Sequence, residues 1–191
     1  MKAVLFFFAA CQLSAVSNAE AQTLPPAKVS YENYEALVAA VKPHRAQRLV
    51  GLSRFLEMSR EPNTIILDTR SAEMYRRKHI KGAVNLSFSD FTQESLAALI
   101  PSRNTRILIY CNNNIEGDPL VFATKTVVPK LAGPETKPVT LALNIPTYIN
   151  LYGYGYTNVF ELSELVPVLH AGLEFEGADM HRYKTFQRYK K

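Results

Sequence analysis

Residues 107–118 read Ile-Leu-Ile-Tyr-Cys-Asn-Asn-Asn-Ile-Glu-Gly-Asp, a short apolar run followed by a cysteine and a loop rich in asparagine. A short apolar run bounded by turn-forming residues is typical of a strand buried in a sheet core. The sequence therefore predicts a strand over residues 106–110 that delivers Cys111 to the start of a loop.

The loop after Cys111 contains residue types that accept unusual backbone conformations. Asparagine and glycine tolerate the left-handed region better than other residues, so this loop can curl its N–H groups around the sulfur. Such a nest of amides binds anions and favours a thiolate. The alternative is a small buried cysteine that serves only as packing. On the first interpretation the substrate-binding residues are Asn112, Asn113, Asn114, Ile115, Glu116 and Gly117.

Strand and helix patterns alternate along most of the chain. Apolar runs predict strands at 47–50, 64–68, 106–110 and 158–162, and residues 79–86 are expected to form a turn that leads into a further strand. Helical spacing predicts a helix over 31–41 stopped by Pro43, one capped by Ser53, and one over 141–151. This order indicates an α/β fold with a mostly parallel five-stranded sheet flanked by helices, in which sites lie beyond the carboxyl ends of the strands. Cys111 falls at such an end.

The N-terminus has the pattern of a secretory signal. Lys2 precedes an apolar run over 3–10, and the segment ends in Ala19-Glu20-Ala21. A positive start, a short apolar core and an A-x-A-like end predict cleavage near Ala21 and a periplasmic or secreted protein. The run is too short to span a bilayer as a helix. A lipoprotein signal ending at Cys11 is the alternative.

Cleavage after Ala21 would leave Cys111 as the only thiol of the mature chain. No intramolecular disulfide is then possible, and an unpaired cysteine in an exported protein is a candidate reactive group.

Removing Lys2 and Glu20 keeps the net charge at +5. This modest excess includes a basic tail at 182–191, which we interpret as a solvated extension. We expect no nucleic-acid partner, no integral membrane span and a monomer.

The expected organisation has four parts. Residues 1–21 form the signal peptide, and residues 22–46 form a linker and an N-terminal helix. Residues 47–169 form the domain, and residues 170–191 form a basic C-terminal tail. Within the domain, residues 116–140 hold four prolines and form an inserted loop, because so long a connection in a compact domain is usually functional or disordered.

Four markers in order make residues 47–169 resemble the rhodanese-like domain family. The first is Leu67-Asp-Thr-Arg70 with Glu73 and Tyr75, and the second is His79-Ile-Lys-Gly-Ala83 with Asn85. The third is the strand that ends at Cys111, and the fourth is a helix followed by Gly155-Tyr156 and Asn158-Val159. The resemblance implies a three-layer α/β domain. Active members of the family are sulfurtransferases whose cysteine carries a persulfide, and they use no metal and no organic cofactor.

The resemblance also implies roles for single residues. Cys111 would be the catalytic nucleophile, with a small sulfur donor or a thiol acceptor, including a protein thiol, as its partner. Asp68 and Arg70 would brace the loop as structural support, and His79 would hold the turn of the second marker.

Several departures from the family pattern lower the expected activity. About 30 residues separate Cys111 from the next helix, and no arginine follows the cysteine before Arg182. Glu116 and Asp118 lie where a cation would stabilise a thiolate. Lys78 and Lys81 replace the usual glycine and proline of the second marker. We therefore expect weak turnover of thiosulfate, and we expect the insertion to take the helix terminus away from the sulfur.

Three functions remain open at this point. The first is an exported sulfurtransferase or sulfur carrier, and the second is a catalytically silent rhodanese-like binding module. The third is a cysteine-dependent phosphatase, which the missing arginine disfavours because phosphate recognition relies on that side chain. The four histidines show no metal-ligand spacing. Weighing inward amides against Glu116 and Asp118, we predict that the thiol titrates below a free cysteine, near pH ~7.

Overall fold

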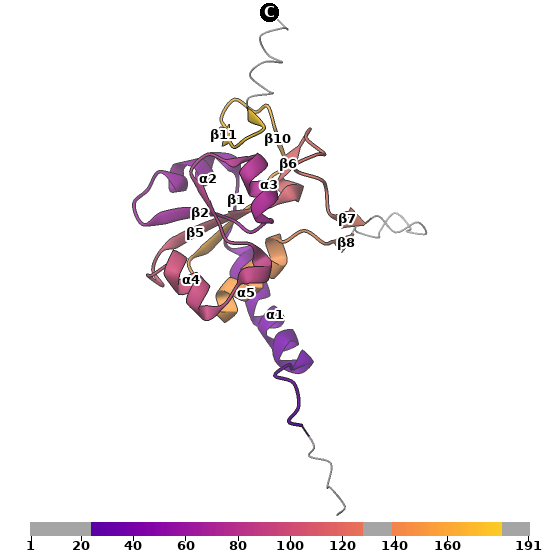
Figure 1. The fold of residues 1–191 in the computed structure, drawn as a ribbon. Helices are drawn as coiled ribbons and strands as arrows, with labels where there is room; N and C mark the ends of the chain where they lie inside the picture. The colour runs from indigo at the N-terminus through magenta and orange to yellow at the C-terminus, as the bar shows by residue number, and fades with distance from the viewer. Residues whose placement is uncertain (1–23, 128–138, 181–191) are drawn as a thin grey trace, which may run out of the picture. The chain divides into compact units, whose positions relative to one another are not determined.

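The computed structural model describes residues 24–127 and 139–180. The expected signal segment, part of the inserted loop and the end of the basic tail lie outside these ranges. By their contacts, residues 1–30 form one unit, and the unit that begins at Tyr31 holds every helix and strand of the described residues. Figure 1 shows the arrangement of these elements.

A five-stranded sheet forms the centre of the domain, and all of its strands are parallel. The strand that carries Cys111 at its end is the middle one. The strands are, in spatial order, β1 (Leu49–Val50), β9 (Val159–Leu162), β5 (Arg106–Tyr110), β2 (Thr64–Asp68) and β4 (Ala83–Asn85). The predicted α/β class and mostly parallel five-stranded sheet are confirmed.

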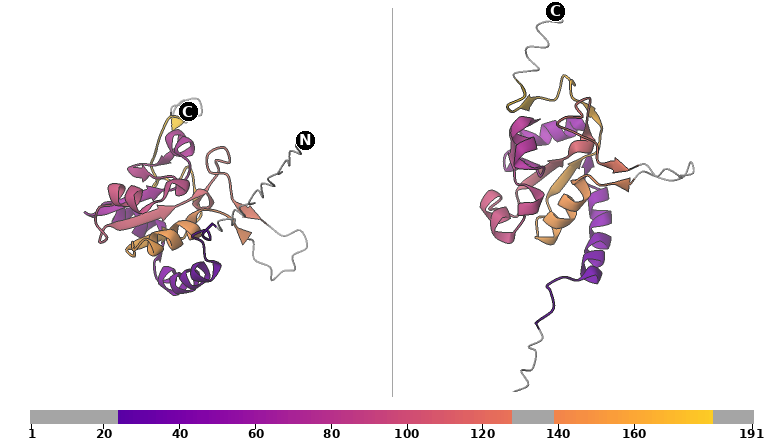
Figure 2. Two further views of the ribbon diagram at one scale, coloured as in Figure 1. Left: turned by 60° about the horizontal axis from the view of Figure 1, so that its bottom comes forward. Right: turned by 45° about the vertical axis from the view of Figure 1, so that its right-hand side comes forward.

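Helices pack on both faces of this sheet, as the two views in Figure 2 show. They are α1 (Tyr31–Ala46), α2 (Leu52–Ser59), α3 (Ala72–Arg77), α4 (Gln93–Leu99) and α5 (Asn144–Gly153), with 3-10 turns at Phe88–Asp90 and Asn112–Asn114. Helix α2 covers one face of the sheet, and α1, α4 and α5 cover the other. The domain therefore has three layers.

The side chains of β5 alternate between two hydrophobic cores. Leu108 and Tyr110 belong to the core that contains Phe55 of α2, whereas Ile107 and Ile109 belong to the core formed with α1, α4 and α5. A strand whose side chains are buried on both faces reads as a continuous apolar run, because alternate residues enter different cores. This explains why the sequence located β5 and β2 at their observed bounds.

Three two-stranded ladders extend the domain beyond the sheet. They pair β3 (His79–Ile80) with β11 (Phe175–Glu176), β6 (Ile115–Glu116) with β10 (Val166–Pro167), and β7 (Thr126–Val127) with β8 (Val139–Thr140). The β6–β10 pair is parallel and the other two are antiparallel. None of the helices formed by the described residues is long and apolar enough to cross a membrane.

Two local predictions were wrong. Helix α1 continues through Pro43 to Ala46, because Arg45 forms a double hydrogen bond with Glu161 and His44 contacts the Tyr148 hydroxyl, which anchors the last turn. Helix α2 begins at Leu52 rather than after a Ser53 cap, since the Glu164 carboxylate accepts the hydrogen bond of the Leu52 N–H. In both cases a tertiary contact overrides the local signal.

Candidate active site

Cys111 lies at the carboxyl end of the central strand, where the sequence placed it. Its backbone is extended, and its side chain is nearly removed from solvent, with 2% of the residue exposed. Within the described residues Cys111 is a free cysteine that forms no disulfide. Asp68 ends the neighbouring strand β2 in register with Tyr110, so the parallel pairing brings the first marker and the cysteine to the same edge of the sheet.

Two backbone amides point at the sulfur. The N–H of Leu143 donates to Cys111 Sγ at 3.3 Å, and the amide of Asn112 also hydrogen-bonds to the sulfur. Leu143 is the N-cap residue of α5. The expectation that the insertion removes this helix terminus from the sulfur was therefore wrong. Strands β7 and β8 pair at the base of the insertion, so the chain returns to the cysteine.

Burial of the thiol opposes the effect of these amides. Burial raises the pKa of Cys111 above its ordinary value, while the amides of Leu143 and Asn112 and the charge of Arg70 offset part of this effect. The prediction of a thiol that titrates near neutrality was wrong. The prediction left out the burial of the sulfur. Burial disfavours the charged thiolate, and the sequence of the loop does not reveal it.

The three asparagines fasten the loop with their side chains. Asn114 accepts the Cys111 N–H at 2.9 Å and donates to the Leu162 carbonyl at 2.7 Å. Asn112 donates to the Ala123 carbonyl at 2.8 Å, and Asn113 accepts the Lys125 N–H at 2.7 Å. The contacts of Asn112 and Asn113 tie the 3-10 turn to residues 123–125, and those of Asn114 tie it to the end of β9.

The remaining residues of the expected nest are distributed around this turn. The backbone N–H of Asn114 donates to the carbonyl of Cys111. Ile115 is buried and pairs with Val166, whereas Glu116 and Gly117 are exposed. Gly117 has a φ of 89°, the left-handed conformation that the sequence anticipated at a glycine.

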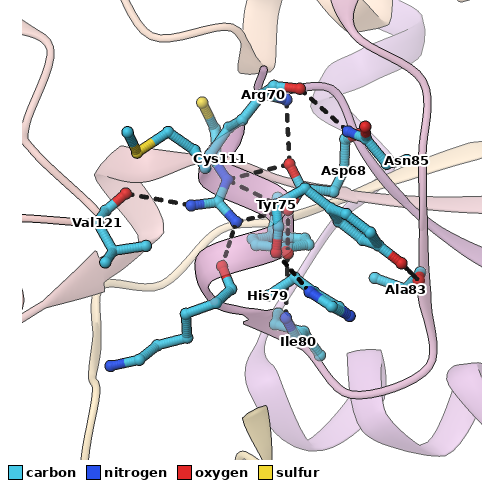
Figure 3. Close-up of polar contacts among 12 residues, drawn as sticks. Asp68, Arg70, Tyr75, His79, Ile80, Ala83, Asn85, Cys111 and Val121 are labelled. Atoms are coloured by element: carbon cyan, nitrogen blue, oxygen red, sulfur yellow. Dashed lines mark hydrogen bonds and ion pairs between the residues drawn. The ribbon is translucent and has the colours of Figure 1, made fainter. Parts of the chain in front are cut away.

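Asp68 and Arg70 form a buried ion pair at the centre of a hydrogen-bond network, shown in Figure 3. The Arg70 guanidinium donates to Asp68 Oδ2 at 2.6 Å, to the Lys78 carbonyl at 2.7 Å and to the Val121 carbonyl at 3.1 Å. The Tyr110 hydroxyl donates to Asp68, and burial raises the pKa of Tyr110 well above its ordinary value. The arginine thus links the second marker to the loop that follows the cysteine.

His79 is a structural residue in this arrangement. Its Nδ1 lies 2.7 Å from the Tyr75 carbonyl, and its ring stacks on that of Tyr75 with 3.8 Å between centroids. Its Nε2 lies 3.3 Å from Glu176 of β11. These contacts agree with the support role implied for His79 and leave it facing the C-terminal ladder.

A buried Lys78–Asp118 ion pair is the feature that sequence reasoning missed. Lys78 Nζ lies 2.6 Å from Asp118 Oδ2, and the two side chains are 1% and 3% exposed. Both residues had been noted as separate departures from the family pattern. The structure joins them, because a cation in the second marker neutralises an acid in the loop after the cysteine. Their opposite charges were the available signal, but 40 residues separate them in the chain.

The comparison with known families agrees with this geometry. Residues 52–163 match the family described as rhodanese-like domain. The chain belongs to the rhodanese-like family. The match covers β2, the second marker, the Cys111 strand and β9, which are the elements that build the site described above.

Individual relatives are more distant. The chain is 33% identical over 46 residues to the thiosulfate sulfurtransferase PspE of Escherichia coli K12, an alignment that spans 24% of this chain and 43% of that protein. The structure of the BH2092 protein from Bacillus halodurans is 21% identical, with a TM-score of 0.37 over 68% of this chain and 74% of that one. The Alr3790 protein from Anabaena sp. is 22% identical, with a TM-score of 0.41 over 69% of this chain and 96% of that one.

Proposed function

We propose that this rhodanese-like protein carries sulfane sulfur as a persulfide on Cys111. The observation that carries the proposal is the Leu143 N–H, which donates to Sγ at 3.3 Å from the start of α5. Amides at a helix N-terminus stabilise negative charge. Both steps of a persulfide cycle place negative charge on Cys111 Sγ, first as the attacking thiolate and then as the thiolate that leaves, and the Leu143 N–H donates to this atom.

The chemistry requires no group that the chain lacks. In the first step the Cys111 thiolate attacks the outer sulfur of a donor such as thiosulfate, the donor S–S bond breaks, and sulfite leaves with the electron pair. In the second step an acceptor thiolate attacks the outer sulfur of the persulfide and releases the Cys111 thiolate. Covalent catalysis of this kind divides one transfer into two displacement steps.

Thiosulfate is expected to be a poor donor for this site. Asp68 holds the guanidinium of Arg70 in a buried pair, and Asp118 holds the ammonium of Lys78 in another. Bidentate recognition of an anion such as thiosulfate relies on a free guanidinium. Among the described residues no arginine follows Cys111, so a donor that carries less charge suits the site better.

A second candidate function is a binding module without sulfur chemistry. The burial of Cys111 and its raised pKa favour this candidate, because a protonated and covered thiol is a weak nucleophile. For persulfide formation a donor must reach a cysteine that is only 2% exposed. The two functions differ in whether Cys111 ever holds an added sulfur atom.

We further propose that the protein acts after export, in the periplasm or outside the cell. The support is the sequence pattern from Lys2 to Ala21, in residues outside the described ranges. N-terminal sequencing of the mature protein tests this proposal. A start at Met1, or a lipidated Cys11, would contradict it.

Intact-mass spectrometry tests the sulfur proposal directly. Protein purified without reductant, or incubated with thiosulfate or with a small organic persulfide, is expected to gain the mass of one sulfur atom. Reductant should remove that atom. The Cys111→Ser variant, which changes one atom of a buried side chain, is the matched control and should gain nothing. If no donor adds sulfur to the folded protein, the binding-module function replaces this proposal.

A further inference from the structure

A pocket of about 340 Å³ lies beside the buried cysteine, on the segment that separates Cys111 from α5. Its apolar lining comes from Ile115, Pro119, Phe122 and Leu165. Leu165 is 57% exposed, so it offers apolar surface to a ligand in the pocket. A volume of this size accommodates a small organic molecule rather than a folded partner.

Asn112 separates the pocket from the sulfur. It lines the pocket, and its Oδ1 lies 3.9 Å from Cys111 Sγ. Its Nδ2 donates to the Ala123 carbonyl, so the same side chain contacts the thiol and also holds the segment around Ala123 in place. A molecule in the pocket is therefore one side chain away from the reacting atom. This distance matters because an acceptor thiol must approach within van der Waals contact of the sulfur it receives.

The charged residues that line the pocket all carry the same sign of charge. Its charged lining residues are the acids Glu116 and Asp118, and none of the described side chains that line it is a lysine or an arginine. Lys78 neutralises Asp118, whereas Glu116 is exposed at the mouth. Uncharged polar groups of Asn113 and Thr126 complete the rim. Among the described residues that line the pocket, an anionic ligand would meet the Glu116 carboxylate and no lysine or arginine.

We propose that this pocket binds the thiol-bearing substrate of Cys111 and selects a small organic thiol with an uncharged or cationic body over an anionic one. The substrate role rests on the proposed sulfur chemistry. The charge selection rests on the pocket itself and can be measured without any sulfur transfer.

The experiment uses three methanethiosulfonate reagents on the full mature chain, with trimethylammonioethyl, methyl and sulfonatoethyl tails. In each reaction the Cys111 thiolate attacks the sulfenyl sulfur, the bond to the sulfonyl group breaks, and methanesulfinate leaves with the electron pair. All three reagents react by this step, so the fraction of Cys111 present as thiolate cancels in the ratio of their rates. The ratio then reports how the charge of each tail changes the rate of reaction in the pocket. Rates are normalised to those of a free thiol of low molecular mass.

We expect the cationic reagent to react at least about fivefold faster than the anionic one, which corresponds to a single screened charge close to the reagent. Glu116→Gln should reduce the ratio toward one, and Glu116→Lys should invert it. Leu165→Arg, which places a cation in the pocket lining, should also favour the anionic reagent. Glu94→Lys, an exposed acid on α4 outside the pocket, is the matched control and should leave the ratio unchanged.

A separate variant distinguishes the steric effect of the Asn112 side chain from the effect of the Glu116 charge. Asn112→Ala is expected to raise the rates of all three reagents by a similar factor, because it removes the side chain between the pocket and the sulfur while leaving Glu116 in place. Equal rates for the cationic and anionic reagents, or a ratio that Glu116→Lys does not change, would overturn the proposal. Failure of all three reagents to modify the folded chain would also overturn it. Failure of persulfide formation alone would leave the charge ratio intact and would count against the sulfur chemistry instead.

Discussion

Two opposing effects act on the Cys111 thiol. Loss of water around a group that is 2% exposed disfavours the thiolate, while the Leu143 and Asn112 amides and the Arg70 charge favour it. Burial is the larger effect, and the pKa of Cys111 is raised. The amides and the Arg70 charge therefore offset only part of the effect of burial.

The raised pKa can be measured from thiolate absorbance in the ultraviolet, taken as the difference between the protein and Cys111→Ser. We expect a midpoint above the ordinary cysteine value of about 8.5 in the folded chain and near that value in urea. Between the two pKa values the unfolded state binds fewer protons, so the free energy of unfolding should fall as pH rises above about 8.5. Cys111→Ser should lack this dependence. A folded midpoint below the urea value would mean that the amides outweigh burial.

At the scale of the elements, the Lys78–Asp118 pair connects the second marker to the cysteine loop. Asp118 also begins a turn, since its carbonyl accepts the N–H groups of Val121 and Phe122. The Val121 carbonyl in turn accepts from Arg70. The two buried ion pairs thus fix opposite ends of the same turn, which holds the lining of the pocket in place.

Breaking this pair on one side should be costly. Lys78→Met or Asp118→Leu removes one of the two opposite charges of the buried pair, and we expect each to lower the free energy of unfolding by about 3–5 kcal/mol. The double variant Lys78→Met/Asp118→Leu should recover most of the loss, because it removes both desolvated charges. The measurement is urea denaturation of all three proteins.

The chain provides a matched control for this cycle. Lys81 and Glu174 lie at the same 2.6 Å separation, but their side chains are 60% and 71% exposed. Water screens such a pair, so Lys81→Met should change stability little. A Lys78→Met loss no larger than that of Lys81→Met would contradict the structural role given to the buried pair.

The same elements show what the sequence could and could not predict. Strands β2 and β5 were located because a strand buried on both faces leaves a continuous apolar run. Cys111 was located because it ends that run. Leu143 had no detectable signal, since its contribution is a backbone amide that only the β7–β8 ladder brings back to the sulfur. The Lys78–Asp118 pair was missed because lysine is rarely buried and contacts between distant residues leave no local pattern.

At the scale of the whole molecule, the domain extends beyond the residues that match the family. The chain after residue 163 supplies β10, which pairs with β6 of the cysteine loop, and β11, which pairs with the second marker. Leu173 enters the core next to α2, and the Phe175 ring lies 5.7 Å from that of Phe122. The described residues after 163 therefore pack against both the second marker and the loop that follows Cys111.

One glycine holds this segment against α3. Gly177 has a φ of 129°, and a Cβ built there would lie 2.5 Å from the Arg77 carbonyl oxygen. The tight approach lets Ala178 and Asp179 donate to the carbonyls of Arg76 and Arg77. A side chain at residue 177 would have to push the two segments apart.

Gly177→Ala is therefore expected to lower the free energy of unfolding by about 1–3 kcal/mol, since it adds backbone strain to a direct clash. Gly82→Ala separates the two causes, because Gly82 also has a positive φ, of 79°, but its Cβ would meet nothing within 4 Å. If the C-terminal segment braces the site, hydrogen exchange at Ile115 and Glu116 should accelerate in Gly177→Ala and not in Gly82→Ala. Opening of β11 alone, with β6 still protected, would mean that the cysteine loop keeps its shape without this brace.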